Sequence, residues 1–579
     1  MPSQAKENIS ELKRVLRSGR SGFIVVGVFS LFINLLMLVQ PFYMLQIFDR
    51  VLRSESMETL VFLTLIVFGL FVIMGLLQFI RSRILVRLGV RLDQDLSGRL
   101  FESMFRNSLQ RPGSDSAQAL DDMTSYRQFL TGPGILALFD APWMPIYLAL
   151  MFVFHPLLGW YGVACTLIVA GLSYANEVVT RKPLAIANEA NRKARRFATN
   201  NVRNAEVIHA MGMEPSIRER WLQRQGETVD SQAHASDKAG IFSNASRSVR
   251  FMAQAFAYGI GAYLIIQGEL SGGMLIAGAI LIGRALAPLD QIIGSWRQIA
   301  QARTAYSRLE ELLETYPASL RRMSLPGPDG ALSVEQVTSA PAGSRTPVIR
   351  GISFNLEPGD SLGVVGPSGA GKSSLARVIL GVWPILNGAV RLDGADMGQY
   401  NREELGPHIG YLPQDIELFD GTIAENIARF QSVDDDAVVQ AARRAGAHDL
   451  IVHLPNGYDT PVGVGGNTLS AGQRQRIGLA RALYGDPRLV VLDEPNSNLD
   501  DAGEKALEQA MQTLRQAGST VIVITHKRNI LAQVQKLMIL RGGQLAGFGA
   551  RDEVLARLQG SSQQPAVTQG NQRQGGQSA

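Results

Sequence analysis

The chain has 579 residues, of which 46% are hydrophobic, and its mean hydropathy is +0.06. This balance excludes fibrous, collagenous and wholly disordered proteins, and it predicts that apolar residues are concentrated in segments. The 56 basic and 51 acidic residues leave a net charge of +5, which suggests nucleic acid as a partner unless the basic residues serve another purpose. The single cysteine, Cys165, excludes an internal disulfide and a thiolate zinc cluster.

Six apolar runs, each of about 20 residues, fill the first half of the chain, and this is the length of a helix that crosses a bilayer. The second run, residues 59–80, contains no charged residue. A buried soluble helix is the alternative for any one run, above all for the third and sixth, but six in succession favour membrane spans. The runs cover residues 22–45, 59–80, 135–154, 156–176, 249–267 and 272–293.

Basic residues are concentrated on one side of these spans. Residues 1–21 hold five, the connection 81–134 holds eight and the connection 177–247 holds twelve. The intervening loops are nearly bare: the first holds Arg50 and Arg53, and 155–159 and 268–271 hold none. Because positively charged connections stay in the cytoplasm, we expect both termini there. This topology explains the basic excess, so nucleic-acid binding becomes unnecessary. The two long connections carry periodic apolar residues, which predicts helices that continue past the bilayer as two arms.

Composition divides the chain further. After the last span, a Pro- and Gly-rich stretch is typical of a linker. Short β-like runs that alternate with helical patterns follow it and indicate an α/β domain, and the polar end of the chain is expected to be disordered. We therefore expect a cytoplasmic segment at 1–21, an all-α membrane domain of six helices at 22–314, a linker at 315–330, an α/β domain at 331–558 and a tail at 559–579.

The first functional motif of the α/β domain is a phosphate-binding loop. Residues 366–373 read GPSGAGKS and fit the pattern G-x-x-x-x-G-K-[ST] after a predicted buried strand. The glycines let backbone N–H groups turn toward phosphate oxygens at a helix N-terminus. Lys372 is expected to neutralise the β- and γ-phosphates, and Ser373 to ligate Mg²⁺. A plain Gly-rich turn is the alternative, against which the flanking strand and helix argue. The predicted nucleotide-binding residues of this region are Gly366, Pro367, Ser368, Gly369, Ala370, Gly371, Lys372, Ser373 and Ser374.

Two acidic residues end a second predicted strand, at residues 489–492. Carboxylates at the carboxyl end of a strand lie where open α/β sheets bind their ligands. Asp493 is expected to hold Mg²⁺, and Glu494 to polarise the attacking water. Such a strand is common by itself, but together with the phosphate-binding loop it predicts an ATPase site. Between the two motifs, Ser470 precedes a helix whose N-terminus offers backbone N–H groups to a second anion.

The order of the motifs resembles that of ATP-binding-cassette exporters of the half-transporter type, in which six spans precede one cassette. The further motifs of the family are a glutamine loop at Gln414, a signature at 469–473, an SNLD loop at 497–500 and a switch histidine, His526. The resemblance implies a homodimer whose cassettes face each other head to tail and trap two ATP molecules. It implies Glu494, His526 and Gln414 as catalytic residues, Ser373, Gln414 and Asp493 as metal-binding residues, and Ser470, Ala471, Gly472, Gln473 and Asp500 as further nucleotide-binding residues.

The sequence departs from the family pattern in two places. Ala471 stands where the signature usually has glycine, but its backbone N–H is still present. Ala340 stands near the place of an aromatic residue that stacks on adenine in the family, so a weaker nucleotide affinity is expected. The resemblance also implies coupling helices, which dock on the cassettes, near residues 120–130 and 204–215.

Three longer segments of the membrane half, 34–52, 122–159 and 270–296, resemble type I secretion ATPases, in particular exporters of alkaline metalloproteases, lipases and haem carriers. This resemblance implies an unfolded protein cargo with an uncleaved C-terminal signal, a periplasmic adaptor, an outer-membrane channel and a place in the bacterial inner membrane. Export or flipping of lipids or hydrophobic small molecules is the alternative. A soluble cassette ATPase conflicts with the six spans, and a regulatory channel conflicts with the intact Glu494.

Two charged residues fall inside the predicted spans, Asp140 in the third and Arg284 in the sixth. Ionisable groups at such depth usually face a cavity or a partner. They could pair with each other or line the path of the cargo. The alternative is that both lie near the cytoplasmic boundary in contact with water.

Overall fold

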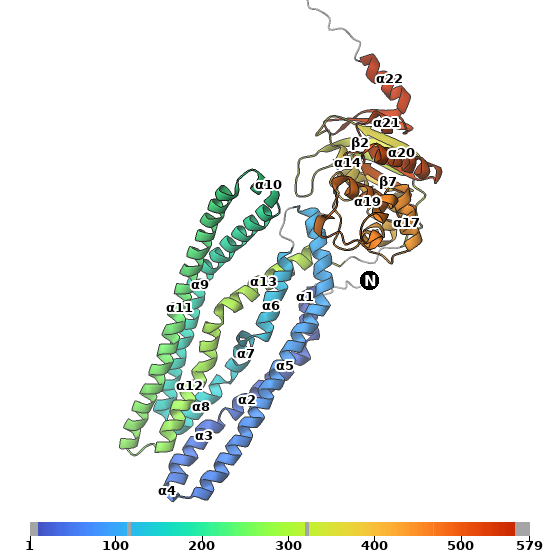
Figure 1. Ribbon diagram of the computed structural model, residues 1–579. Helices are drawn as coiled ribbons and strands as arrows, with labels where there is room; N and C mark the ends of the chain where they lie inside the picture. The colour runs from blue at the N-terminus through green and yellow to red at the C-terminus, as the bar shows by residue number, and fades with distance from the viewer. Residues whose placement is uncertain (1–9, 113–116, 319–323, 467, 562–579) are drawn as a thin grey trace, which may run out of the picture. The chain divides into compact units, whose positions relative to one another are not determined.

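The computed structural model describes residues 10–112, 117–318, 324–466 and 468–561 (Figure 1). The chain divides into a helical unit, residues 1–107 and 115–318, and an α/β unit, residues 108–114 and 319–579. Most of the predicted disordered tail lies outside the described residues, as do 1–9 of the predicted N-terminal segment and 319–323 of the predicted linker.

Six stretches of the chain are helical, long and apolar enough to cross a membrane, which confirms the six predicted spans. These stretches are Arg20–Ser54, Met57–Gln110, Pro133–Phe154, Pro156–Val202, Glu214–Ile266 and Gly272–Gly294. The helices of this part of the chain are α1 (Glu11–Ser18), α2 (Arg20–Leu36), α3 (Val39–Gln46), η1 (Ile47–Val51), α4 (Leu52–Ser54), α5 (Met57–Gln110), α6 (Gln118–Thr131), α7 (Pro133–Asp140), η2 (Ala141–Trp143), α8 (Met144–Phe154), α9 (Pro156–Val202), α10 (Ala205–Ala210), α11 (Glu214–Ile266), α12 (Gly272–Gly294) and α13 (Trp296–Thr315).

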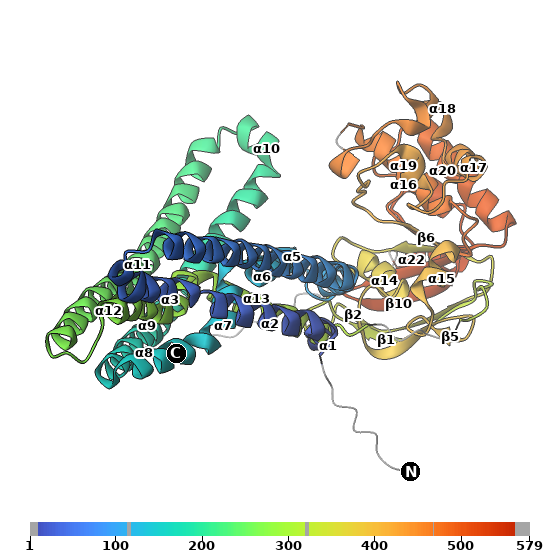
Figure 2. The ribbon, with the colours of Figure 1, turned by 90° about the horizontal axis from the view of Figure 1, so that it is seen from below.

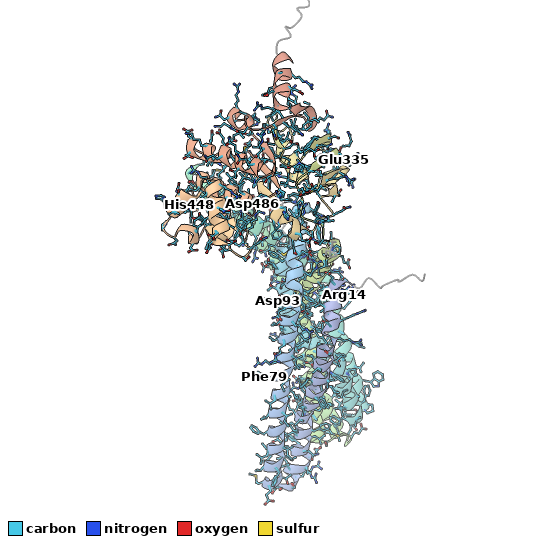
Figure 3. The ribbon with its side chains drawn as sticks, turned by 90° about the vertical axis from the view of Figure 1, so that its right-hand side faces the viewer. Arg14, Phe79, Asp93, Glu335, His448 and Asp486 are labelled. Atoms are coloured by element: carbon cyan, nitrogen blue, oxygen red, sulfur yellow. The ribbon has the colours of Figure 1, made fainter. Side chains whose placement is uncertain are left out.

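In the first part of α5, residues 57–80, no side chain is buried, whereas leucines further along the helix, such as Leu96 and Leu100, are. Phe62 is 68% exposed, and Phe79, which is labelled in Figure 3, is 59% exposed. In water such a surface would be a large unfavourable apolar patch, whereas the hydrocarbon of a bilayer covers it. The chain is therefore a multi-pass membrane protein, and the apolar runs of the sequence report contact with lipid as well as burial in protein.

The helices α9 and α11 form an arm. They have 47 and 53 residues, so at about 1.5 Å per residue each extends well beyond the roughly 30 Å hydrocarbon core of a bilayer. The two helices pack along one another, and α10 connects them at the far end (Figures 1 and 2). Within the segment 204–215, where a coupling helix is predicted, the structure places this short helix.

The other predicted coupling segment, residues 120–130, lies inside α6, which packs against α13 within the helical unit. Tyr126 and Leu130 of α6 are buried there. One face of this segment is therefore packed within the helical unit, and its predicted docking on the cassette stays a prediction. The connection between α5 and α6 includes residues 113–116, which lie outside the described part of the chain.

A polar network crosses the interior of the helical unit where the third span is interrupted. Pro142 lies in η2, and since proline has no N–H to donate, the helix breaks between α7 and α8. Asp140, the last residue of α7, accepts hydrogen bonds from Arg81 of α5 at 2.8 Å and from Asn34 of α2 at 3.0 Å. The hydroxyl of Tyr147 donates to the side chain of Asn34 at 2.8 Å. The network thus ties three spans together.

Arg284 of α12 does not join Asp140, because it donates a hydrogen bond to Gln40 of α3 at 2.9 Å. Of the alternatives left open by the sequence, direct pairing of Asp140 with Arg284 is therefore not observed. Asp140 is not in open contact with water either, since its side chain is only 14% exposed and that of its partner Arg81 is 8% exposed. The acid is compensated by a cation from the second span, where sequence reasoning singled out no charge.

The buried ion pair generates a first prediction. Asp140→Ala leaves the Arg81 guanidinium buried without its acidic partner, so we expect a loss of about 3–5 kcal/mol in stability. The double substitution Arg81→Leu with Asp140→Leu leaves no buried charge and should recover most of that loss. Thermal unfolding of the purified protein in detergent measures both effects.

The matched control for this prediction is Asp93→Ala. Asp93 pairs with Arg127 at 3.2 Å, but both side chains are about one third exposed, so the loss should stay below about 1 kcal/mol. Equal losses for Asp140→Ala and Asp93→Ala would contradict a special role for the buried network.

The α/β unit contains two sheets. The larger has the order β10-β9-β3-β8-β7-β6, in which β10 is antiparallel to β9 and the other five strands are parallel; the smaller is antiparallel with the order β2-β1-β4-β5. The strands are β1 (Leu332–Ser339), β2 (Ile349–Leu356), β3 (Ser361–Val365), β4 (Ile385–Leu392), β5 (Ala395–Asp396), β6 (Ile409–Leu412), β7 (Leu489–Asp493), β8 (Thr520–Ile524), β9 (Lys536–Arg541) and β10 (Gln544–Ala550).

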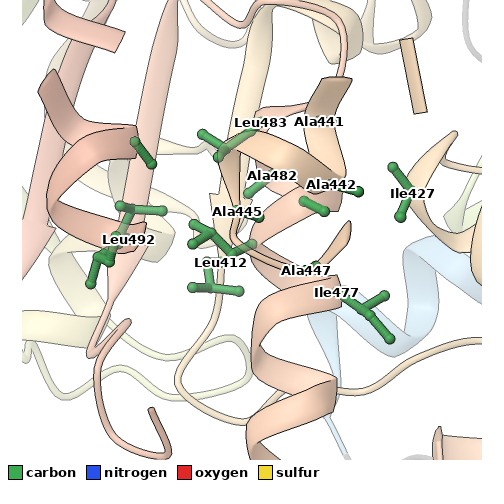
Figure 4. Packing of buried hydrophobic residues seen from close by; sticks show 14 of the residues in the cluster. Leu412, Ile427, Ala441, Ala442, Ala445, Ala447, Ile477, Ala482, Leu483 and Leu492 are labelled. Carbon is green, nitrogen blue, oxygen red and sulfur yellow. The ribbon is translucent and has the colours of Figure 1, made fainter. Parts of the chain in front are cut away.

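Helices surround the larger sheet and form a second apolar core. In Figure 4, Ile427 of α16, Ala441 and Ala442 of α17, and Ile477 of α19 pack with Leu492 of β7. The alanines let the helix backbones approach closely. The helices of this unit are α14 (Lys372–Ile379), α15 (Arg402–Leu405), η3 (Gly406–His408), α16 (Ile423–Ile427), α17 (Asp435–Arg444), α18 (His448–Val452), η4 (Gly457–Asp459), η5 (Val464–Gly466), α19 (Ala471–Leu483), α20 (Asp501–Gln516), α21 (Arg528–Leu531) and α22 (Arg551–Ser561), the last extending past residue 558.

Candidate functional site

Four neighbouring parallel strands deliver the predicted motifs to one edge of the larger sheet. The phosphate-binding loop follows β3, His526 follows β8, Asp493 and Glu494 end β7, and Gln414 follows β6. The strands are mostly apolar and mostly buried, so the side chains that can act on a ligand come from the carboxyl ends of the strands and the residues that follow. Motifs that lie up to 160 residues apart in the sequence therefore meet at a single site.

The phosphate-binding loop turns through two left-handed glycines. Gly369 has φ +76° and Gly371 has φ +95°, a region that glycine occupies at no steric cost. No side chain caps the N-terminus of α14, so its N–H groups are available to an anion. Lys372 is 8% exposed, and its ammonium donates to the carbonyl oxygens of Gly366 at 2.8 Å and Pro367 at 3.2 Å. Its charge is thus held directly over the loop.

The carboxylate of Asp493 fits a magnesium ligand. The residue is 2% exposed, and its Oδ1 has no hydrogen-bond partner in the part of the chain that the structure describes. Burial raises the pKa of Asp493 above its ordinary value, while a hydrogen bond from the Ser373 hydroxyl opposes this shift. A charged carboxylate is therefore costly here without a cation. Mg²⁺ prefers oxygen ligands, and these two residues supply them at the mouth of the phosphate-binding loop.

The carboxylate of Glu494 is the point on which the other predicted catalytic residues converge. Gln414 donates from Nε2 to Oε2 of Glu494 at 3.2 Å, and Nε2 of His526 lies 4.0 Å from Oε1. The backbone of Glu494 has φ +49°, and its N–H donates to the carbonyl of Ile524 on β8 at 2.9 Å. A left-handed conformation at a residue other than glycine is strained, and such strain is found where a side chain must be aimed.

Gln475 of α19 holds the chain that follows Glu494, and sequence reasoning missed it. The side chain is 1% exposed. Its Nε2 donates to the carbonyl oxygens of Glu494 at 3.3 Å and Pro495 at 2.6 Å, while its Oε1 accepts from Ser497 at 3.3 Å and Asn498 at 3.1 Å. The predicted signature helix is therefore tied to the turn that positions Glu494. The signal for Gln475 in the sequence is a polar residue on the buried face of this helix.

The signature residues organise the start of α19. The Ser470 hydroxyl accepts from the N–H of Gln473 at 3.2 Å, and the Gln473 side chain accepts from the N–H of Ser470 at 2.8 Å. The N–H groups of Ala471 and Gly472 lie in the same exposed first turn. A Cβ on Gly472 would lie 2.9 Å from the carbonyl oxygen of Asn498, so glycine permits this close approach. Within one chain, no hydrogen bond joins this helix end to the phosphate-binding loop among the described residues.

Asp500 acts within its own chain as the N-cap of α20. It accepts from the N–H of Gly503 at 2.9 Å and pairs with Arg476 of α19. The bond from Gly503, and then that from Arg476, holds the pKa of Asp500 below its ordinary value. The carboxylate is therefore charged at neutral pH, and its predicted link to a second site remains a prediction.

Ala340 follows directly after β1 and is completely buried. It presents no surface on which an adenine ring could stack. The sequence placed the missing aromatic near this residue, whereas the structure shows a packed strand end at that position.

Comparison with known proteins decides the family. Residues 23–288 match the ABC transporter transmembrane region, and residues 349–497 match the ABC transporter family. The chain is 45% identical over 545 residues to the type I secretion system ATP-binding protein PrsD of Rhizobium meliloti (strain 1021), and the match covers 94% of each chain. The chain belongs to the type I secretion ABC exporters. As a member of this family, the exporter binds ATP and is an ATPase coupled to transport.

Two further relatives of the exporter are named for secretion or translocation. It is 29% identical over 547 residues to the cyclolysin secretion/processing ATP-binding protein CyaB of Bordetella pertussis, covering 92% of the exporter and 75% of that protein. It is 28% identical over 559 residues to the leukotoxin translocation ATP-binding protein LktB of Mannheimia haemolytica, with 93% and 77% covered. These relatives agree with the predicted secretion of protein.

A solved structure supports the fold. The structure of a bacterial Atm1-family ABC exporter with ATP bound superposes with a TM-score of 0.80 at 23% identity, covering 93% of the exporter and 97% of that chain. The predicted fold class, a six-helix membrane domain followed by an α/β nucleotide-binding domain, is confirmed.

Gln475 generates the second prediction. Gln475→Leu keeps the side-chain volume but removes four hydrogen bonds around the turn of Glu494, so kcat for ATP hydrolysis should fall about 10–100-fold, as for other residues that hold an active group through its neighbours. The KM for ATP should change little, because Gln475 bonds only to the exporter's own chain. Steady-state ATPase assays of the full-length exporter measure both constants.

Gln512→Leu is the matched control, since Gln512 is exposed on α20 and, among the described residues, its side chain bonds only to Gln533. This variant should leave kcat unchanged. A rise in KM for Gln475→Leu at constant kcat would contradict the positioning role, and so would an unchanged kcat.

Proposed function

We propose that the exporter hydrolyses ATP at the edge formed by β3, β8, β7 and β6, with Glu494 as the general base. The convergence of Gln414 and His526 on this carboxylate is the observation that carries the proposal. Glu494 accepts the proton of the attacking water, while Gln414 orients the carboxylate and His526 contacts the γ-phosphate. Lys372 exchanges the carbonyls of its own loop for the β- and γ-phosphates.

The proposed site holds Mg²⁺ through Ser373 and Asp493, with Gln414 beside it. When bound, Mg²⁺ neutralises charge on the phosphate oxygens during transfer. The remaining residues of the loop, Gly366 to Ser374, supply serine hydroxyls and, except for Pro367, backbone N–H groups to the phosphates. Asp493 becomes favourable as an anion in this state, because the cation offsets the cost of its burial.

Two copies of the chain complete two sites in this proposal. The N-terminus of α19, with Ser470, Ala471, Gly472 and Gln473, offers N–H groups that no phosphate of its own chain uses. In a head-to-tail dimer it meets the ATP held by Lys372 of the second copy. Every motif is intact in one chain, so a symmetric homodimer is sufficient. Asp500, charged and exposed, lies near this seam and links the two sites.

The third prediction tests the shared sites. Exporters that contain one Lys372→Ala chain and one Ser470→Arg chain keep one intact site, because both lesions fall in the same pocket. About half of the wild-type ATPase activity is expected from purified heterodimers of this kind. The matched control places both substitutions in one chain and pairs it with a wild-type chain, so that each pocket receives one lesion. This control should be inactive. Activity in the control but not in the first heterodimer would show that each chain works alone.

We further propose that the cargo is an unfolded protein with an uncleaved C-terminal signal, such as a metalloprotease, lipase or haem carrier. The exporter lies in the bacterial inner membrane with both termini in the cytoplasm, which the distribution of basic residues supports. A periplasmic adaptor and an outer-membrane channel complete the path. Relatives named for type I secretion, cyclolysin secretion and leukotoxin translocation support protein over lipids or hydrophobic small molecules as cargo.

The fourth prediction concerns this cargo. Glu494→Gln should bind ATP without hydrolysing it, and should therefore retain a tagged metalloprotease cargo and the adaptor during purification with Mg²⁺ and ATP. Lys372→Ala is the control, since it cannot hold the phosphates and should retain at least tenfold less. The same cargo without its C-terminal segment should not be retained by either variant. Equal recovery of the truncated cargo would contradict the proposed signal, and stimulation of the ATPase by lipids instead of cargo would favour the flippase alternative.

A further inference from the structure

An open pocket of about 720 Å³ lies in the helical unit, between α1 and α2 on one side and α6 and α7 on the other. One part of its lining is basic and carries Lys13, Arg17 and Arg20, and the rest is mostly apolar. Its volume is within the roughly 300–1,000 Å³ of ordinary ligand sites. Neither ATP hydrolysis nor the proposed cargo path assigns any role to these residues.

The basic part of the pocket carries positive charges that are not paired within the described part of the chain. Lys13 pairs with Glu310 of α13 at 2.7 Å, and this bond holds α1 against α13. Arg17 and Arg20 are exposed, and neither side chain has an ion pair or hydrogen bond within the described part of the chain. Two guanidinium groups at one mouth of a pocket suit a phosphate, which accepts their N–H groups in pairs.

The apolar part of the pocket follows the first span away from these arginines. Phe23 of α2 stacks with Phe139 of α7 at a centroid distance of 6.4 Å, and Ile24 is 55% exposed. Gly27, one turn further along α2, leaves the floor open, since a Cβ there would come no closer than 4.0 Å to Phe139. The floor therefore has room for a hydrocarbon chain.

The position of the pocket indicates which kind of ligand with a phosphate or another acidic group fits it. Arg20 is the first residue of a membrane span, which is the level of lipid headgroups, and the aromatic floor continues into the span. A free phosphate would leave that floor uncovered. An acidic peptide would bring unpaired backbone N–H and C=O groups into the hydrocarbon. A molecule with an anionic head and an apolar tail satisfies both parts.

We propose that this pocket binds one anionic phospholipid for each chain. Its phosphate lies at Arg17 and Arg20, and one acyl chain lies along Phe23, Gly27 and Phe139. The lipid bridges α1, which is bound to α13, and the interrupted third span. With the orientation proposed above, the lipid comes from the cytoplasmic leaflet. It is a bound component of the exporter and not its cargo.

Native mass spectrometry of the full-length exporter in detergent tests the charged part of the site. Phosphatidylglycerol is compared with phosphatidylethanolamine of the same acyl chains, and one phosphatidylglycerol for each chain is expected to bind more tightly. Arg17→Gln should weaken its binding about fivefold, and Arg17→Gln with Arg20→Gln about 25-fold. Arg14→Gln is the matched control, because Arg14 lies on the same helix without lining the pocket (Figure 3). Equal binding of both lipids, or equal effects of Arg14→Gln and Arg17→Gln, would overturn the proposal.

A second pair of variants tests the apolar part without changing charge. Gly27→Leu fills the floor and should weaken phosphatidylglycerol binding at least tenfold. Gly69→Leu is its control, since Gly69 of α5 has no atom within 4 Å of its ideal Cβ, and it should bind as the wild type does. ATPase activity and thermal unfolding verify that each variant is folded. Unchanged lipid binding in Gly27→Leu would overturn the proposed place of the acyl chain.

The identity of the occupant is tested by a photoreactive side chain at Ile24. In vesicles that contain phosphatidylglycerol, the crosslinked product should be the exporter with one lipid added. A crosslink to a second exporter chain or to cargo would assign the pocket to a protein partner and overturn the proposal. Because these measurements read lipid binding and not hydrolysis or secretion, their outcome is independent of the proposed catalytic and cargo roles.

Discussion

The chemistry of this exporter depends on the alignment of four parallel strands whose carboxyl ends share one edge. Strand β3 ends in the phosphate-binding loop, β7 in Asp493 and Glu494, and the strands on either side of β7 supply His526 and Gln414. Each strand is held by its neighbours' backbone hydrogen bonds and by apolar side chains on both faces. A shift of one strand by a residue would turn its terminal side chains to the opposite face. The register of the sheet thus fixes the distances on which hydrolysis depends.

At the same edge of the sheet, two residues are held in conformations or environments that cost stability. Asp493 is buried with an oxygen that has no hydrogen-bond partner among the described residues, and Glu494 adopts a left-handed backbone. Both features are unfavourable in the free chain. The proposed Mg²⁺ would relieve the first, and the second is held in place by the bond to Ile524 and by the hydrogen bonds of Gln475. Because Gln475 belongs to the signature helix, its hydrogen bonds join that helix directly to the turn that carries Glu494.

In the helical unit, the bilayer imposes a different constraint. Backbone groups must be satisfied within each helix, and charged side chains must find partners inside the protein. The network of Asp140, Arg81 and Asn34 satisfies the second requirement, next to the break at Pro142. At the boundary of the bilayer, Arg17 and Arg20 have no acidic partner among the described residues, and the headgroup region provides the anion that the protein does not.

The sequence by itself determined the elements whose signal is local. The lengths of the apolar runs gave the six spans, because a bilayer core has a fixed thickness, and the motifs at predicted strand ends gave the ATPase and the family. Tertiary structure alone decided which distant side chains meet. Asp140 pairs with Arg81 instead of Arg284, and Gln475 hydrogen-bonds to the turn that carries Glu494. Both interactions join residues of different elements. The packing of α6 against α13 and the burial of Ala340 likewise follow from neighbours that lie far away in sequence. Spacing along a chain reports the face on which a side chain lies, whereas its partner is set by how the elements pack.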